Sequence, residues 1–125
     1  MIRVYKSKAF KKWADKEGLP NTQLCKAVDE MQRGLLDADL GSGVVKKRVA
    51  VSGRGKRGSF RTIVAYRMAF RAFFIYGFAK NSRANISKSE LLALKRLAGE
   101  LMAYEPRQLK LAIFNGALFE VECNE

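Results

Sequence analysis

The sequence has no histidine and only two cysteines, and both shortages narrow the possible chemistry. Without histidine the chain lacks the commonest general acid and base and the commonest metal ligand. Cys25 and Cys123 stand alone, without a CxxC pair, so we expect two ordinary thiols, no metal site and no cofactor. A disulfide would need an oxidising compartment, which nothing in the sequence indicates.

Long apolar runs are also missing. No run approaches the roughly 18 residues of a membrane span, and the N-terminal stretch has no uninterrupted apolar core of the signal-peptide kind. We therefore expect a cytoplasmic protein that binds no membrane. At 125 residues the chain is expected to form one domain whose core needs no disulfide or metal to hold it together.

Acidic residues are missing from the centre of the chain, since no Asp or Glu lies between Asp39 and Glu90. Half of the 24 basic residues lie in that same window. The other 12 are balanced by the 12 acidic residues of the chain, so the net charge of +12 arises in the window. A field of one sign attracts polyanions, and nucleic acid is the expected partner. A membrane surface is the second choice, because basic membrane binders usually carry their cations on an amphipathic helix.

A short strand and two amphipathic helices are expected at the N-terminus. The first helix can be capped by Ser7 and ended by Gly18. Pro20 can start the second helix, which keeps a 3.6-residue apolar period. The residues of that period are Leu24, Ala27, Val28, Met31 and Leu35. Residues 37–43 are expected to form a turn or loop.

Three strands are expected next, over residues 43–51, 59–67 and 71–80, and their short links predict an antiparallel meander. Ser87-x-x-Glu90 is a capping box that opens a further amphipathic helix. The segment after Pro106 can form a hairpin at Asn115-Gly116 or a short helix followed by a strand, and we favour the helix. This order of elements predicts an α+β fold.

Four motifs in order resemble a known family. They are the strand K-x-R at Lys46 and Arg48, the loop GRGKRG, the strand SFRTIVAYR, and the strand end Y-G-x-x-K-N at residues 76–81. Together they resemble the RelE/HigB family of bacterial type II toxins, with the closest likeness to the HigB branch. The resemblance covers about residues 1–103 and leaves 104–125 as a C-terminal extension. It implies a RelE-like fold, in which an antiparallel sheet packs against two N-terminal helices and carries a C-terminal helix.

The resemblance also implies an activity and a set of partners. Toxins of this kind are metal-independent endoribonucleases that enter the ribosomal A site, cut mRNA there and so stop translation and growth. A small antitoxin, usually a helix-turn-helix protein in the HigB branch, silences them, and the complex binds operator DNA through that antitoxin. The expected partners are therefore a cognate antitoxin, the ribosome and mRNA.

The residue types present can support RNA cleavage without histidine. The reaction needs a base for the 2′-hydroxyl, stabilisation of the phosphorane charge and an acid for the leaving oxygen. A lysine close to other cations can have a lowered pKa and so can act as the base. The two parallel N–H groups of an arginine guanidinium can bind two oxygens of one phosphate. Such a cluster would act poorly on free RNA, and a ribosome that positions the message would compensate.

The sequence places the candidate site on the central strands. Lys46 and Arg48 share one strand face, and Lys47 points the other way. Arg61 shares a face with apolar neighbours, where a charged side chain is unusual and indicates a functional role. The expected catalytic residues are Lys46, Arg48, Arg61 and Lys80. The expected RNA-binding residues are Lys47, Arg54, Lys56, Arg57 and Arg83.

Two other functions remain open at this point. A ParE-like toxin of the same fold would act on DNA gyrase, although that branch tends to lack the cation set found here. A non-catalytic RNA- or DNA-binding protein would explain the charge but not an inward Arg61. Aromatic residues exposed on a sheet face would favour this second alternative, and a regular strand would leave either Phe73 or Phe74 exposed.

Overall fold

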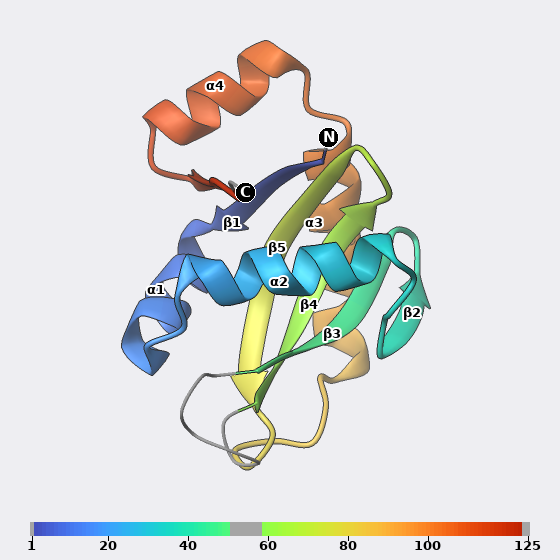
Figure 1. Cartoon of the computed structure of the whole chain (residues 1–125). Coiled ribbons are helices and arrows are strands. Elements are labelled where there is room, and N and C mark those ends of the chain that lie inside the picture. The colour runs from blue at the N-terminus through green and yellow to red at the C-terminus, as the bar shows by residue number, and fades with distance from the viewer. Residues whose placement is uncertain (1, 51–58, 124–125) are drawn as a thin grey trace.

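The computed structural model describes residues 2–50 and 59–123, which form one six-stranded sheet with helices on both faces (Figure 1). The elements in chain order are β1 (Arg3–Ser7), α1 (Lys8–Glu17), α2 (Asn21–Gln32), β2 (Ala38–Gly41), β3 (Val44–Ala50), β4 (Ser59–Arg67), β5 (Arg71–Ala79), α3 (Lys88–Met102), α4 (Pro106–Phe114) and β6 (Leu118–Val121). The predicted α+β class is confirmed. Among the described helices none is long and apolar enough to cross a membrane.

The strand order is β2-β3-β4-β5-β1-β6. The meander β3-β4-β5 is antiparallel, as predicted. The N-terminal strand β1, however, pairs in parallel with β5, so the sheet is mixed rather than wholly antiparallel. The chain makes this parallel pairing possible because more than sixty residues, including both N-terminal helices, separate β1 from β5 and give the crossover its length.

Local sequence signals set the ends of the N-terminal helices. The Ser7 hydroxyl accepts a hydrogen bond from the Phe10 amide at 3.1 Å, and Gly18 ends α1 in the left-handed conformation at φ 72°. Pro20 precedes α2, whose buried residues follow the predicted period as far as Met31. Leu35 breaks that prediction, because α2 ends at Gln32 and the Leu35 side chain is 53% exposed.

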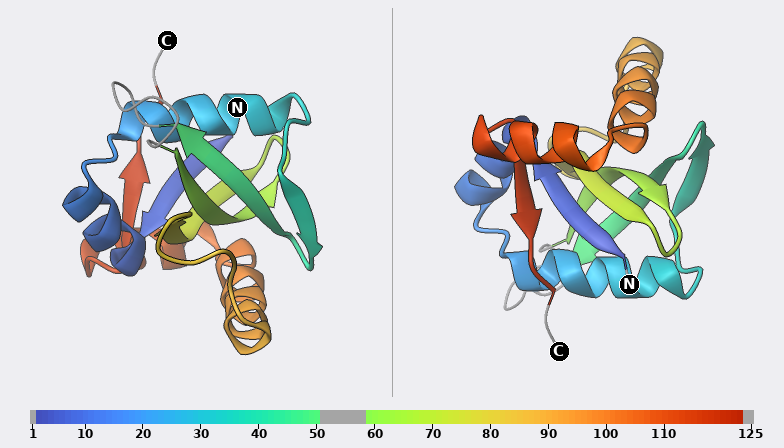
Figure 2. Two further views of the ribbon diagram at one scale, coloured as in Figure 1. Left: turned by 90° about the horizontal axis from the view of Figure 1, so that it is seen from below. Right: turned by 90° about the horizontal axis from the view of Figure 1, so that it is seen from above.

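Helices on both faces of the sheet produce two cores (Figure 2). The first core lies between the sheet and helices α1 and α2, and the second lies between the sheet and helices α3 and α4. Phe74 belongs to the first core and Phe73 to the second, and both are fully buried. The expectation that one of them is exposed is therefore wrong, because it assumed a sheet with one open face.

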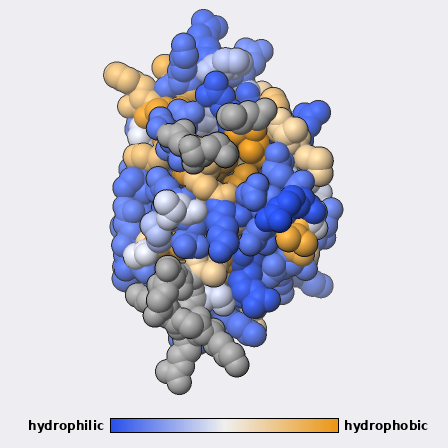
Figure 3. Space-filling view, viewed as in Figure 1, coloured by the Kyte–Doolittle hydropathy of each residue, from blue (hydrophilic) through white to orange (hydrophobic). Residues whose placement is uncertain are grey.

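The outer surface of α2 matches its amphipathic pattern. In Figure 3 the surface over α2 is mostly hydrophilic, and apolar side chains show above it, between α2 and α4. The buried side of α2 supplies Leu24, Val28 and Met31 to the first core. Because the polar side faces outward, α2 needs no further partner to cover it.

The segment predicted to be a turn or loop at 37–43 contains a strand instead. Ala38–Gly41 forms β2 and pairs antiparallel with β3 at the edge of the sheet. Three consecutive residues with positive φ, Gly41, Ser42 and Gly43, make the tight reversal between the two strands. A four-residue edge strand that ends in a glycine gives little periodic signal, so only its pairing with β3 identifies it.

The C-terminal segment joins the same sheet. The capping box at Ser87 and Glu90 opens α3, and Pro106 opens α4, which together with β6 confirms the helix-then-strand prediction. Buried Arg71 donates from Nη1 to the carbonyl oxygen of Tyr104 at 2.6 Å and, more weakly, to two carbonyl oxygens of the last turn of α3. This arginine therefore satisfies carbonyl groups that the end of a helix leaves without partners.

The two cysteines form a disulfide, so the expectation of two separate thiols is wrong. Cys25 of α2 is bonded to Cys123, two residues past β6, across a sequence separation of 98 residues. The pairing arises because β6 extends the sheet next to β1 and the chain that follows it reaches α2. A separation of this length gives no sequence signal for the pairing.

Gly77 should not tolerate a side chain, because α1 packs directly on it. A Cβ atom added at Gly77 would clash with the Trp13 ring, which also packs edge-on against Phe60 at 5.0 Å between ring centroids. We expect Gly77→Ala to lower the free energy of unfolding by about 1–3 kcal/mol, since Trp13 must leave its site. Urea denaturation measures this change.

Gly99→Ala is the matched control for that substitution. Gly99 lies within α3, and a Cβ added there meets nothing within 4 Å. Alanine is the better helix former, so this variant should gain about 0.5–1 kcal/mol. Equal stability of the two variants would show that Trp13 does not pack on Gly77 as the structure has it.

Candidate active site

Most of the predicted catalytic cations lie on the face of the sheet that α3 partly covers. Across β3, β4 and β5, one rung of the sheet aligns Lys46, Ile63 and Tyr76, and the next aligns Arg48, Arg61 and Phe78. Residues opposite each other on paired strands share a face. We call this region, defined by Lys46, Arg48, Arg61 and Tyr76, the cationic face. Its three cations include Arg48 and Arg61 as a directly opposed pair of like charges, which is destabilising without an anion.

Arg61 is the most enclosed of these cations. Its side chain is 15% exposed, and its Nη1 atom is buried without a hydrogen-bond partner among the described residues. It pairs loosely with Asp37, whose Oδ2 lies 3.9 Å from Nε, too far for a hydrogen bond. A guanidinium with a buried donor that has no partner is costly in a folded protein, and an oxyanion that reached this donor would offset that cost.

Asp37 belongs to the site although it lies outside the acid-free window. Its Oδ1 accepts a hydrogen bond from the backbone amide of Arg48 at 3.2 Å, and its own amide donates to the Lys46 carbonyl oxygen. The pairing of β2 with β3 brings it there. Asp37 therefore holds the edge of β3 and offsets part of the repulsion between Arg48 and Arg61.

Lys47 lies on the opposite face, as its position in the strand predicts. Its side chain is 8% exposed, and Nζ lies 2.8 Å from Oε1 of Glu30 on α2. A hydrogen bond from Lys47 holds the pKa of the Glu30 carboxyl below its usual range. The structure thus places Lys47 in an ion pair with Glu30, on the face of the sheet opposite to Lys46, Arg48 and Arg61.

Lys80 and the cations of the glycine-rich loop are the next predicted residues. Lys80 is exposed and follows directly after β5, at the start of the turn that leads to Arg83. The three cations predicted in the glycine-rich loop lie outside the described residues. They are Arg54, Lys56 and Arg57.

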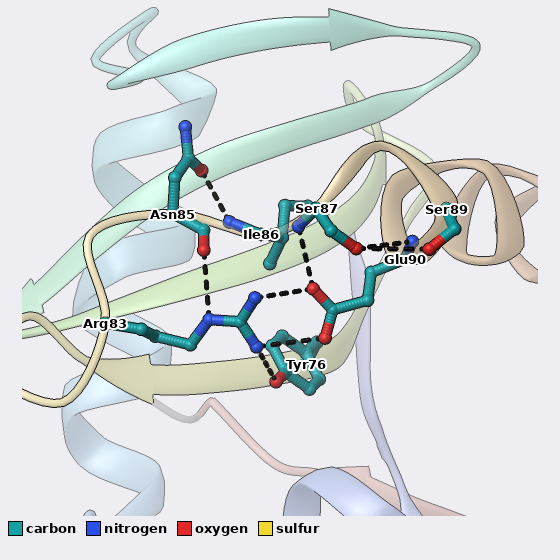
Figure 4. Close-up of polar contacts among 7 residues, drawn as sticks. All are labelled: Tyr76, Arg83, Asn85, Ile86, Ser87, Ser89 and Glu90. Atoms are coloured by element: carbon teal, nitrogen blue, oxygen red, sulfur yellow. Dashed lines mark hydrogen bonds and ion pairs between the residues drawn. The ribbon is translucent and has the colours of Figure 1, made fainter.

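Arg83 is committed to neighbouring groups instead of standing free (Figure 4). Its Nη1 donates to the Tyr76 hydroxyl oxygen at 3.0 Å and to Glu90 at 2.9 Å, and its Nη2 donates to the other oxygen of Glu90. Its Nε donates to the Asn85 carbonyl oxygen at 2.9 Å. The Arg83 hydrogen bonds, together with the Ser87 amide, lower the Glu90 pKa to about 2, so the pair stays ionised at any physiological pH.

A β-bulge in β5 decides which face Tyr76 occupies. Phe74 pairs with Val64 and Tyr76 pairs with Ile63, so Ile75 has no opposite residue on β4. The extra residue shifts the alternation by one, which turns Tyr76 towards the cationic face and Gly77 towards Trp13 of α1. Regular alternation from Phe73 would have pointed Tyr76 the other way.

Sequence reasoning missed two participants, Asp37 and Glu90, and it could not assign Tyr76 to a face of the sheet. Asp37 and Glu90 lie just outside the two ends of the acid-free window, and that position is the only signal in the sequence. Tyr76 follows a bulge that no local pattern marks. All three join the site through strand pairing or through the turn after β5.

The arrangement can bind and stabilise a phosphoryl group. Arg61 offers an unused donor, Arg48 is exposed beside it, and Lys46 lies on the next rung. Guanidinium groups held near a reacting phosphate can stabilise the charge that develops in the transition state. The Tyr76 hydroxyl and the lysine side chains on or next to this face carry protons that could pass to a reacting oxygen.

Comparison with protein-family models gives a match over residues 2–121 to the family described as "RelE toxin of RelE / RelB toxin-antitoxin system". The match therefore includes α4 and all of β6, which lie beyond the motifs recognised in the sequence. A search of curated proteins finds no match to the chain.

Proposed function

Because the chain belongs to the RelE toxin family, and is thus the toxin of a toxin–antitoxin pair, we propose that it stops translation by cutting mRNA on the ribosome. The motif G-K-R-G ahead of β4 supports its assignment to the HigB-like branch of that family. The observation that carries the proposal is Arg61, a mostly enclosed guanidinium with a donor that has no partner among the described residues.

The proposed reaction uses the RNA as its own nucleophile. The 2′-oxygen attacks the adjacent phosphorus and its proton passes to a lysine amine, with Lys46 and Lys80 as the candidates. The bond from phosphorus to the 5′-oxygen breaks, and that oxygen takes up a proton. The products are a 2′,3′-cyclic phosphate and a 5′-hydroxyl. Arg61 and Arg48 stabilise the charge on the phosphorane oxygens.

The ribosome supplies what this cationic face lacks. The described residues of the face include no acid–base pair of the histidine type, so the rate depends on alignment of the 2′-oxygen, the phosphorus and the leaving oxygen. A message held in the decoding site is already fixed in position. The cations of residues 54–57 are proposed to grip RNA phosphates as the toxin enters.

The family implies an antitoxin partner, and we propose a small helix-turn-helix protein in that role. Such an antitoxin would silence the toxin and carry the complex to operator DNA. The chain itself, with its positive field, would then meet DNA only within that complex.

The test is cleavage of a defined mRNA by the purified protein with and without programmed ribosomes. We expect cuts within the reading frame when a ribosome is bound, cyclic-phosphate ends, and at least a hundredfold slower cutting of the free message. Addition of EDTA should change nothing beyond its effect on the ribosome, which a magnesium back-titration controls. Growth arrest on expression without any message cleavage would overturn the proposal and favour a gyrase-directed toxin.

A further inference from the structure

Cleavage as proposed above requires a proton for the leaving 5′-oxygen, and arginine cannot supply it. A guanidinium keeps its protons at any physiological pH, and the Glu90 carboxylate is ionised through its pair with Arg83. Among the described residues of the cationic face, the remaining proton sources are Lys46 and the Tyr76 hydroxyl. The structure distinguishes Tyr76 from Lys46 by how its hydroxyl is held.

Tyr76 lies next to the arginine pair. It shares a rung with Lys46 across Ile63, and Arg61 lies on the neighbouring rung. Diagonal neighbours on paired strands have Cα atoms about 7–8 Å apart, within reach of a shared phosphate for long side chains. The bulge at Ile75 creates this position, and such bulges often re-aim a side chain beside an active site.

Arg83 fixes the direction of the Tyr76 proton. Arg83 Nη1 donates to the tyrosine oxygen at 3.0 Å, and a guanidinium has no acceptor, so the phenolic hydrogen must point elsewhere. No described residue accepts a hydrogen bond from it. Tyr66 on β4 differs from Tyr76, because its hydroxyl hydrogen is engaged in a hydrogen bond to Oε1 of Gln32 at 2.8 Å.

Arg83 is in turn held rigidly. Glu90 binds it through both carboxylate oxygens, and the Asn85 carbonyl oxygen accepts from its Nε (Figure 4). The capping box fixes Glu90 to the first turn of α3. A cation held in this way stabilises a phenolate that forms next to it.

From these contacts we propose that Tyr76 donates the proton to the 5′-oxygen leaving group, with Arg83 and Glu90 as its positioning residues. This inference rests on the proposed ribonuclease function. As the bond between phosphorus and the 5′-oxygen breaks, the phenolic proton moves to that oxygen and the phenolate is left beside Arg83. Water then returns a proton to Tyr76, so the residue is unchanged after one turnover.

The test compares Tyr76→Phe with the wild type on two ribosome-bound messages, one normal and one with sulfur in place of the bridging 5′-oxygen. A thiolate leaves without protonation, so only the normal message needs the acid. We expect Tyr76→Phe to lose about 100-fold or more in single-turnover rate on the oxygen substrate and to match the wild type on the sulfur substrate. Tyr66→Phe, on the other face of the sheet, should match the wild type on both.

Every other outcome overturns either this inference or the ribonuclease proposal on which it rests. An equal loss on both substrates would show that Tyr76 acts through structure or binding, and no loss on either would show that its hydroxyl takes no part. Both results overturn the inference and leave the ribonuclease proposal standing. A wild type that cuts neither substrate overturns the ribonuclease proposal itself. Glu90→Gln is a second test. If Glu90 positions Tyr76 through Arg83, this variant should lose less of the cleavage rate than Tyr76→Phe on the oxygen substrate and should match the wild type on the sulfur substrate.

Discussion

Arg61→Ala should reduce message cleavage by about a hundredfold to a thousandfold and abolish growth arrest. That range is typical when one donor that stabilises transition-state charge is removed. The physical reason is the position of Arg61, which is 15% exposed and loosely paired and has a buried donor without a partner among the described residues. Arg61→Lys should recover little of the activity, because an ammonium keeps the charge but loses the planar fork.

The same substitution should leave the fold intact. Alanine removes one member of the opposed pair Arg48 and Arg61, and Asp37 keeps its hydrogen bond to the Arg48 amide. We therefore expect the urea midpoint to stay close to that of the wild type. Arg67→Ala is the matched control, since Arg67 is an exposed arginine at the far end of the same strand.

Two measurements together settle the role of Arg61. They are 5′-end mapping of messages after induction and urea denaturation of the purified variants. Loss of cleavage with unchanged stability supports the assignment. Full cleavage by Arg61→Ala, or an equal loss by Arg67→Ala, would remove Arg61 from the active site.

Reduction of the Cys25–Cys123 disulfide should lower the free energy of unfolding by about 3–5 kcal/mol. A cross-link limits the conformations of the unfolded chain, and the effect grows with the length of the closed loop. Here the linked residues are 98 positions apart, close to the full length of the chain. The bond also holds the chain end after β6 against α2, so its loss should free that end first.

Urea denaturation with and without dithiothreitol measures this effect. The chain has only these two cysteines, so the reductant has no other target. The double variant Cys25→Ser with Cys123→Ser should show the lower stability in both conditions and no response to dithiothreitol. An unchanged midpoint on reduction of the wild type would show that the bond does not form in solution or contributes nothing to stability.

The sequence by itself determined the features that depend on neighbouring residues. Ser7 and Gly18 set the ends of α1, Ser87 and Glu90 open α3, and Pro106 opens α4, because caps act within one helical turn. The alternation of β3 separated Lys47 from its neighbours for the same local reason. The acid-free window also indicated which strands carry the cationic face, since the charge of a segment depends only on the residues within it.

Only the tertiary structure decided which distant residues meet. The parallel pairing of β1 with β5, the edge strand β2 and the disulfide each depend on contacts between segments far apart in the chain. The bulge at Ile75 turns Tyr76 to the cationic face, and the turn after β5 brings Arg83 between Tyr76 and Glu90. Local propensity carries no information about such approaches, because they arise from the register of paired strands and from burial on both faces of the sheet.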